Sequence, residues 1–240
     1  MKSPNGIRAR VVLAALVMAA PLPAISAEVT LTGWAFGQGV QVASNQYSGH
    51  AGGFTGTLTG AGAFDTNSFL TYCVELEEHF SFSGNAMTNY NVVTGDSYFG
   101  SDKAYRMGQL VSYTRANPSL VNSAFTSAAM QLAVWNLVYD GDASLSAGSF
   151  HDSSGLANYA TGLLFDAAAF GAPTFSVYAL QRRGSQDFLL AAWLPPLGLE
   201  GGPVPIAEPP GLALLAMGLT LVSGIGVWGA RRRRAAAAAP

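Results

Sequence analysis

Two hydrophobic segments, one at each end of the chain, leave only the middle of its 240 residues free to form a globular fold. Residues 11–20 are apolar, follow three basic residues, and lead through small residues to Ala27. This order is typical of a secretory signal peptide that is cleaved after Ala27. The apolar run is too short for a membrane anchor, because a spanning helix needs about 20 such residues. We therefore predict that residues 1–27 are removed on export.

The second hydrophobic segment, residues 211–230, carries no charge. As a helix, about 20 residues at about 1.5 Å each match the thickness of a bilayer core, so this segment is predicted to span the membrane. The arginines that follow predict a basic cytoplasmic tail over residues 231–240. Residues 196–210 contain several prolines that cannot continue a helix, and they are expected to form an exposed linker.

A proline-rich linker, an apolar helix and an arginine cluster in this order resemble the PEP-CTERM sorting signal of Gram-negative bacteria. Ala207 stands where that signal has its first proline, and the next two residues match. The resemblance implies that an exosortase-type enzyme releases the protein from the inner membrane to the cell surface or the extracellular space. A plain single-pass anchor is the alternative. The residues that would form the signal are Glu208, Pro209, Arg231, Arg232, Arg233 and Arg234.

The charge between the two ends narrows the classes of partner. Residues 28–207 contain five Lys or Arg and thirteen Asp or Glu, a net charge of −8. An acidic domain without a basic patch is a poor partner for nucleic acid or anionic lipid headgroups. The chain also has a single cysteine, so an internal disulfide is excluded. That cysteine is a free thiol, an intermolecular partner, or part of an unusual bond.

Periodicity predicts one domain over residues 28–195, with an inserted helical block between strands. Alternating residues predict strands over 28–36, 39–43, 52–58, 68–82, 174–180 and 188–193. Helical spacing predicts helices over 103–114, 123–139 and 154–169. Asn117-Pro118 suits a helix start. The expected fold class is α+β: a β-rich frame, either a sandwich or barrel-like, with the helices inserted and a C-terminal transmembrane helix outside the domain.

Cys73 lies in the longest predicted strand, where alternation puts Glu75, Glu77 and His79 on its face. A metal site is disfavoured, because Cys73 and His79 are about 20 Å apart along a straight strand. A cysteine nucleophile could use His79 or His151 as its base. The neighbouring carboxylates, however, raise the pKa of a thiol and disfavour the thiolate. A passive buried thiol is the usual alternative.

Gln131 lies in the middle of the apolar face of the predicted helix over residues 123–139. A buried carboxamide without partners costs about 1–3 kcal/mol. Gln131 is therefore expected to be hydrogen-bonded, as many core glutamines are, or to be consumed chemically.

Two short motifs resemble those of bacterial thioester domains, which cap surface adhesins. Tyr72-Cys73-Val74-Glu75 resembles their aromatic-Cys-aliphatic-polar motif, and residues 130–135 resemble their Thr-Gln-x-Ala-aliphatic-Trp motif. The resemblance implies an intramolecular thioester in which Cys73 supplies the sulfur and Gln131 the acyl group. The supporting residues of the two motifs would be Tyr72, Glu75, Ala133 and Trp135. A thioester needs shelter from water, and Tyr72, Trp135 and the apolar face of the helix are expected to cover it.

Three hypotheses about function follow from these observations. The first is a surface protein, not an enzyme and without a cofactor, whose thioester reacts with an amine or hydroxyl of a surface or matrix. The second is a passive component of an extracellular matrix or biofilm with a free buried cysteine. The third is a secreted cysteine hydrolase. A thioester would also close a long loop of chain, so a purely structural cross-link is a variant of the first hypothesis.

Overall fold

The computed structural model describes residues 26–80, 82 and 84–193. Within them, six antiparallel strands form one sheet in the order β5-β4-β1-β6-β7-β8, and two short strands pair separately. The six strands are β1 (Ala27–Trp34), β4 (Phe54–Thr59), β5 (Thr66–Thr71), β6 (Met87–Thr94), β7 (Phe175–Gln181) and β8 (Phe188–Trp193). The separate hairpin consists of β2 (Val40–Ala43) and β3 (Ser48–Ala51). The predicted β-rich frame is confirmed.

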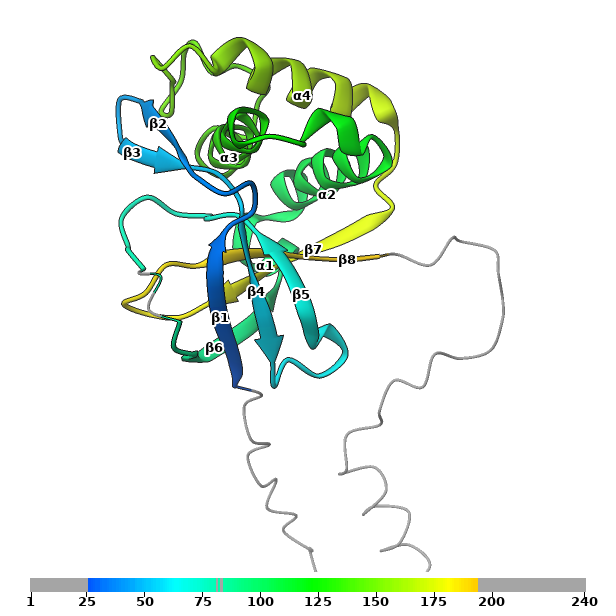
Figure 1. The fold of residues 1–240 in the computed structure, drawn as a ribbon. Coiled ribbons are helices and arrows are strands. Elements are labelled where there is room, and N and C mark those ends of the chain that lie inside the picture. Colours follow the sequence, from blue (N-terminus) through cyan, green and yellow to red (C-terminus); the bar gives the residue numbers. More distant parts are fainter. Residues whose placement is uncertain (1–25, 81, 83, 194–240) are drawn as a thin grey trace, which may run out of the picture. The chain divides into compact units, whose positions relative to one another are not determined.

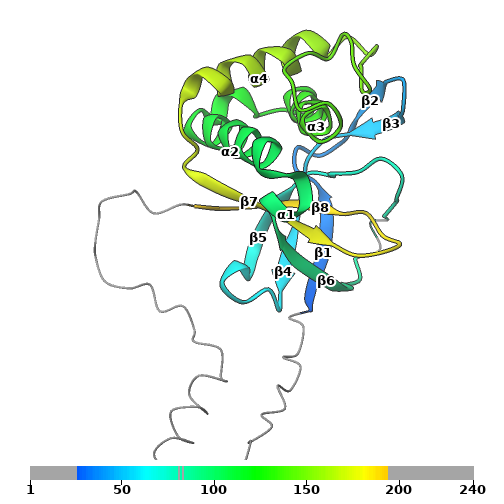
Figure 2. The same cartoon turned by 180° about the vertical axis from the view of Figure 1, so that it is seen from behind.

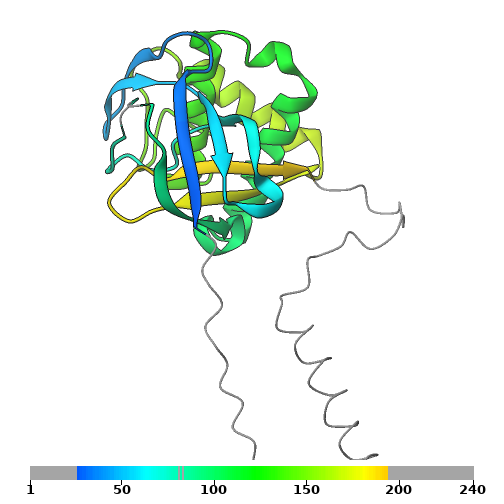
Figure 3. The same cartoon turned by 60° about the horizontal axis from the view of Figure 1, so that its bottom comes forward.

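The two edges of the six-stranded sheet approach each other, so that the sheet curls into a nearly closed barrel (Figure 3). Just beyond β5, the Tyr72 carbonyl accepts a hydrogen bond from the Leu189 amide at 2.9 Å. The Val74 amide donates to the Asp187 carbonyl at 3.1 Å. We call this junction of residues 71–74 with residues 187–189 the seam. It pairs edge groups that would otherwise be open to other chains.

Close contact between β1 and β4 helps the sheet to curl. A Cβ atom on Gly56 would lie 2.0 Å from the Thr30 carbonyl oxygen, so only glycine fits there. The register between the two strands also shifts between Leu31 and Gly33. Such bulges increase the local twist and bend of a strand, which a small barrel requires.

Helices α2 (Ser101–Ala116), α3 (Ala124–Tyr139) and α4 (Ala157–Phe170) lie together on one side of the sheet, and the β2–β3 hairpin lies beside α3 (Figures 1 and 2). The short helix α1 (Gly95–Phe99) precedes α2 and packs against β6 and β7. Two short 3-10 turns, η1 (Gly62–Phe64) and η2 (Pro118–Leu120), complete the described elements. Because all four helices fall between β6 and β7, the predicted insertion of a helical block into a β frame is confirmed.

Helix α3 is the centre of the fold, because every side chain from Ser127 to Leu137 is buried. Ser123 begins the helix by accepting a hydrogen bond from the Thr126 amide, which forms a capping box. Gly141 follows its end with a φ of 77°, a conformation that favours glycine. The predicted helix over 123–139 is confirmed, whereas Asn117-Pro118 starts only the turn η2.

The largest error in the predicted elements is the strand over 68–82. β5 ends at Thr71, and Cys73 forms a single isolated bridge. Beyond it, backbone groups bond to side chains instead of to a neighbouring strand: the Leu76 amide donates to the Tyr139 hydroxyl at 3.0 Å. The carboxylates of Glu75, Glu77 and Glu78 accept hydrogen bonds from backbone amides that are not paired with a neighbouring strand. The alternation of residues therefore predicted a strand that does not form. The elements β3, β6 and α1 were not predicted.

Candidate functional site

Cys73 lies at the seam, where it forms an isolated antiparallel bridge with Phe188. In this bridge the residues on either side of Cys73 make the hydrogen bonds to Asp187 and Leu189, as described above. The N–H and C=O of Cys73 therefore point away from β8 and need other partners. Only 5% of the residue is exposed, so water cannot easily supply them.

Gln131 supplies both partners from helix α3. The Cys73 amide donates to Gln131 Oε1 at 2.9 Å, and Gln131 Nε2 donates to the Cys73 carbonyl at 2.7 Å. The two residues are 58 positions apart in sequence, and Gln131 is only 1% exposed. The structure thus brings together the two residues singled out from the motifs. It holds both polar atoms of the carboxamide against the cysteine backbone.

The Cys73 side chain is a neutral thiol in these surroundings. Burial raises the pKa of the thiol well above its ordinary value, and the nearby Glu75 carboxylate raises it further. A raised thiol pKa is the opposite of what a cysteine hydrolase needs, because the thiolate is the nucleophile. The expectation that neighbouring carboxylates oppose ionisation of Cys73 therefore agrees with the structure.

A cavity of about 240 Å³ adjoins Cys73 and Gln131. One part of its wall is aromatic: the rings of Trp34 and Phe54 lie 4.7 Å apart, and those of Phe54 and Phe80 also 4.7 Å apart. Another part is polar and is formed by His50, Glu75, Glu78, His79 and Gln186. The aromatic wall is apolar, while the polar wall offers groups that can bind a ligand or carry a proton.

His79 shares this cavity with Cys73, although a straight strand would have separated them by about 20 Å. The chain folds back after Val74, so the geometric argument used against a shared metal ion does not apply. Even so, no group of three potential His, Cys, Asp or Glu ligands gathers among the described residues. His151 is not among the residues that line the cavity.

Glu75 is the most perturbed carboxylate of the polar wall. Its pKa is raised to about 7 as the net result of several causes: burial raises it most, a hydrogen bond from the Asp187 amide lowers it, and the charges of Asp187, Glu78 and Glu77 raise it. That hydrogen bond to Glu75 Oε1 is 2.7 Å long. Asp187 in turn accepts a hydrogen bond from the Tyr98 hydroxyl at 2.7 Å. A carboxylate of this pKa exchanges protons near neutral pH.

The other residues of the two motifs fall in different places. Tyr72 does not line the Cys73 cavity, because successive residues of an extended chain point to opposite sides. It lines a separate cavity of about 200 Å³ instead, so our expectation that it covers the cysteine is wrong. Ala133 is fully buried in α3. Trp135 lines the Cys73 cavity, and its Nε1 has no hydrogen-bond partner within the described chain.

Tyr47, which the sequence did not indicate, provides the aromatic cover that Tyr72 does not. It lies in the turn between β2 and β3, and its ring is 5.0 Å from that of Trp135. Its hydroxyl donates to the His50 carbonyl at 2.9 Å, which fixes the turn. Because β3 was not predicted, nothing in the sequence pattern placed this hairpin over α3.

The predicted sorting signal, Glu208, Pro209 and Arg231 to Arg234, lies outside the described residues, as do the linker and the apolar segment 211–230. Residues 1–25 of the predicted signal peptide also lie outside them, whereas Ala27 is the first residue of β1. No helix in the part of the chain that the structure describes has both the length and the apolar character needed to cross a membrane.

Comparison with known proteins finds no matching family model and no matching curated sequence. Among solved structures, the chain is similar to the N-terminal domain of the Streptococcus pyogenes pilus tip adhesin Cpa. The TM-score is 0.45 and the identity 13%, over 73% of this chain and 97% of that one. It is also similar to a cysteine-to-alanine mutant of the N-terminal thioester domain of a Clostridium perfringens surface protein. There the TM-score is 0.39 and the identity 16%, over 54% of this chain and 84% of that one.

Proposed function

We propose that Cys73 and Gln131 form an intramolecular thioester on an exported domain, and that a nucleophile of a surface or matrix opens it to become covalently attached. The observation that carries this proposal is the buried carboxamide of Gln131, held on Cys73 by hydrogen bonds of 2.9 and 2.7 Å. This contact holds the future acyl group at the residue that would attack it, which is the main requirement for an intramolecular reaction.

Formation of the bond needs no further reactant. The Cys73 sulfur attacks the Gln131 side-chain carbonyl carbon, the C–N bond breaks, and the thiol proton leaves with the amide nitrogen as ammonia. Because burial raises the pKa of the thiol, a neighbouring group must accept that proton first. Glu75, whose pKa is raised to about 7, lines the same cavity and is suited to take up the proton and return it.

Opening of the bond transfers the acyl group. An incoming amine or hydroxyl attacks the carbonyl carbon, the C–S bond breaks, and the proton of the nucleophile ends on the Cys73 sulfur. Aromatic side chains around the cavity limit competing hydrolysis. Each protein molecule reacts once and is itself consumed, so the proposed protein is an adhesive and not an enzyme. The reaction requires no cofactor.

Export would bring the bond to its target. In this proposal an exosortase-type enzyme cuts near Glu208-Pro209 while residues 211–230 are in the inner membrane, and the domain then reaches the cell surface or the extracellular space. Replacing Arg231 to Arg234 with neutral residues should leave the protein in the membrane fraction. Unchanged release in that variant would exclude an arginine-dependent sorting signal.

A second candidate function is a passive matrix protein. Both polar atoms of Gln131 already have partners, as in a core glutamine whose only role is to pair the backbone of Cys73. In that case the thiol would remain free and the cavity would have no acyl group to present. A cross-link that forms but never meets a nucleophile is the intermediate case.

Intact mass distinguishes these candidates. Protein purified without amine buffers should weigh less than its sequence by one ammonia, and methylamine should add one amine at residue 131 and expose one thiol. Both effects should vanish in Cys73→Ala and in Gln131→Ala. Gln109→Ala is the matched control. Gln109 is another buried glutamine, on α2, and its Nε2 donates a hydrogen bond to the Gly171 carbonyl at 2.7 Å. An unmodified mass with a freely alkylated Cys73 would exclude the thioester.

A further inference from the structure

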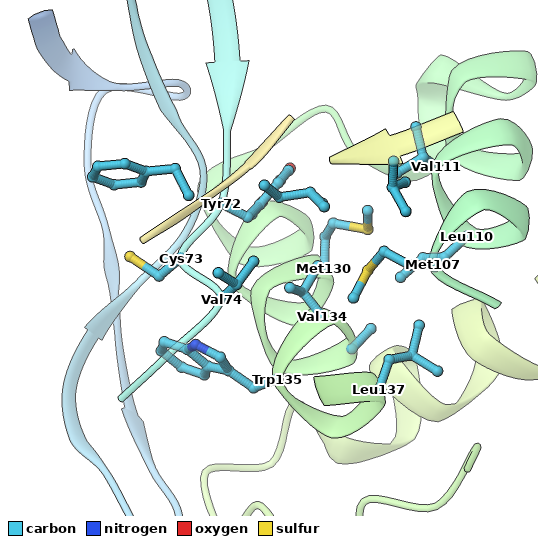
Figure 4. Packing of buried hydrophobic residues seen from close by; sticks show 14 of the residues in the cluster. Tyr72, Cys73, Val74, Met107, Leu110, Val111, Met130, Val134, Trp135 and Leu137 are labelled. Atoms are coloured by element: carbon cyan, nitrogen blue, oxygen red, sulfur yellow. The ribbon is translucent and has the colours of Figure 1, made fainter. Parts of the chain in front are cut away.

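Trp135 carries a polar group for which the described structure offers no partner. Its indole N–H makes no hydrogen bond, although only 3% of the residue is exposed. Buried donors without partners are rare in folded proteins and call for an explanation. Trp135 lines the same cavity as Cys73 and Gln131, and Figure 4 shows the nitrogen on the edge of the indole that faces Cys73.

The position of the indole is set in advance. Trp135 lies one helical turn after Gln131 on α3, so the two side chains project from the same face of the helix. Rings on other elements hold the indole from two directions: Tyr47 at 5.0 Å and Phe150 at 6.0 Å between centroids. A donor fixed in this way needs little reorganisation when a charge develops near it.

Gln131 Oε1 has room for a second donor. A carbonyl oxygen has two lone pairs, and the only donor to Oε1 among the described contacts is the Cys73 amide at 2.9 Å. When sulfur or an external nucleophile attacks the carbonyl carbon, this oxygen acquires a negative charge. Acyl-transfer sites commonly stabilise such an oxyanion with two hydrogen-bond donors.

We propose that the indole N–H of Trp135 and the backbone N–H of Cys73 together form the oxyanion hole for acyl transfer at Gln131, an inference that rests on the thioester proposed above. During bond formation they stabilise the tetrahedral intermediate that expels ammonia. During aminolysis they stabilise the intermediate that expels the Cys73 sulfur. In that step the C–N bond forms, the C–S bond breaks, and the proton lost by the amine ends on the thiol.

The test compares the aminolysis of Trp135→Phe with that of the unchanged full chain. Phenylalanine keeps an aromatic ring and removes the N–H. The expected result is a thioester that reacts with methylamine roughly 100-fold more slowly, as when one oxyanion donor is lost elsewhere. Trp193→Phe is the control, because it makes the same substitution at an exposed tryptophan of β8 that does not line the cavity. It should react at nearly the unchanged rate.

An infrared measurement separates a hydrogen bond from packing. With carbon-13 in the glutamine side chains, the thioester carbonyl stretch should move to higher frequency when the indole donor is lost and should stay in place in Trp193→Phe. If Trp135→Phe fails to fold, benzothienylalanine at position 135 keeps the shape of the indole and replaces N–H by sulfur. The same rate and frequency changes are expected there.

The outcomes separate this inference from the proposed function. If the unchanged protein carries no thioester by mass, the proposed function fails and this inference fails with it. If the thioester is present, and the variants at position 135 react at the unchanged rate with an unchanged carbonyl frequency, the oxyanion role of Trp135 is overturned and the thioester stands. A slower reaction without a frequency change would also overturn it, since altered packing would then account for the rate.

Discussion

Helix α3 is buried on two sides that differ in chemistry. On one side Val134 and Leu137 pack with Met107 and Leu110 of α2, all of them apolar side chains (Figure 4). On the other side Gln131 and Trp135 face the seam and the cavity. Packing on the apolar side depends on side-chain volume and tolerates side chains of similar size. The seam side depends on individual polar atoms, each with one hydrogen-bond partner or none among the described residues.

This difference teaches how one helix can serve both stability and chemistry. The apolar contacts hold α3 against α2. They therefore fix the carboxamide of Gln131 in position against the backbone of Cys73. The seam side carries the groups that can react. Variants of the two sides should therefore separate loss of stability from loss of chemistry.

The largest loss of stability is expected from Leu137→Ala on the apolar side. Leu137 is 2% exposed, and truncation of such a leucine costs about 2–5 kcal/mol through lost contacts and the cavity left behind. Denaturant unfolding should show this loss, while the folded fraction keeps the mass deficit of one ammonia. A folded Leu137→Ala protein without that deficit would contradict the division between the two sides.

Next come Cys73→Ala and Gln131→Ala on the seam side. Each removes the cross-link, whose effect on the unfolded chain is worth about 4 kcal/mol at most for a loop of this length. Gln131→Ala should cost more than Cys73→Ala, because it also leaves the N–H and C=O of Cys73 unpaired. The double variant should be no less stable than Gln131→Ala. Additive losses in this cycle would indicate two independent core residues.

A smaller effect is expected from Ser123→Ala, which removes the cap of α3. Ser123 Oγ accepts from the Thr126 amide at 3.2 Å, and loss of such a cap costs about 1 kcal/mol. Because the change lies at the helix start, the methylamine reaction should keep its rate. Thermal unfolding checks the loss of stability, and the mass assay checks the rate of the methylamine reaction. A changed reaction rate would show that the seam depends on the helix end as well.

The smallest effect concerns pH. Burial raises the pKa of Glu75 from 4.5 to about 7, so the folded state binds this proton more tightly than the unfolded state. The stabilisation is complete below about pH 4.5 and is lost as pH rises through 7. Glu75→Gln should therefore flatten the fall in stability between these values. Glu28→Gln, at an exposed glutamate on β1, is the control. An unchanged slope in Glu75→Gln would contradict the shift.

Local signals explain what could be predicted. The helical spacing over residues 123–139 predicted α3, because helical periodicity is set within a few residues of the chain. The strands β1, β4, β7 and β8 were predicted from alternation for the same reason. The failure after Thr71 is instructive, because Glu75 and its neighbours alternate like a strand while their backbone bonds to side chains of distant elements.

By itself, the sequence determined the α+β class, the burial of Gln131 and the single cysteine that can partner it. Only the tertiary structure decided that the Gln131 carboxamide pairs with the backbone of Cys73 and that Tyr47 takes the covering position expected of Tyr72. It also decided that the indole N–H of Trp135 has no partner among the described residues. The physical reason is distance along the chain. Helix spacing and caps are local, whereas the seam, the hairpin and α3 meet only when the barrel closes and the helices pack.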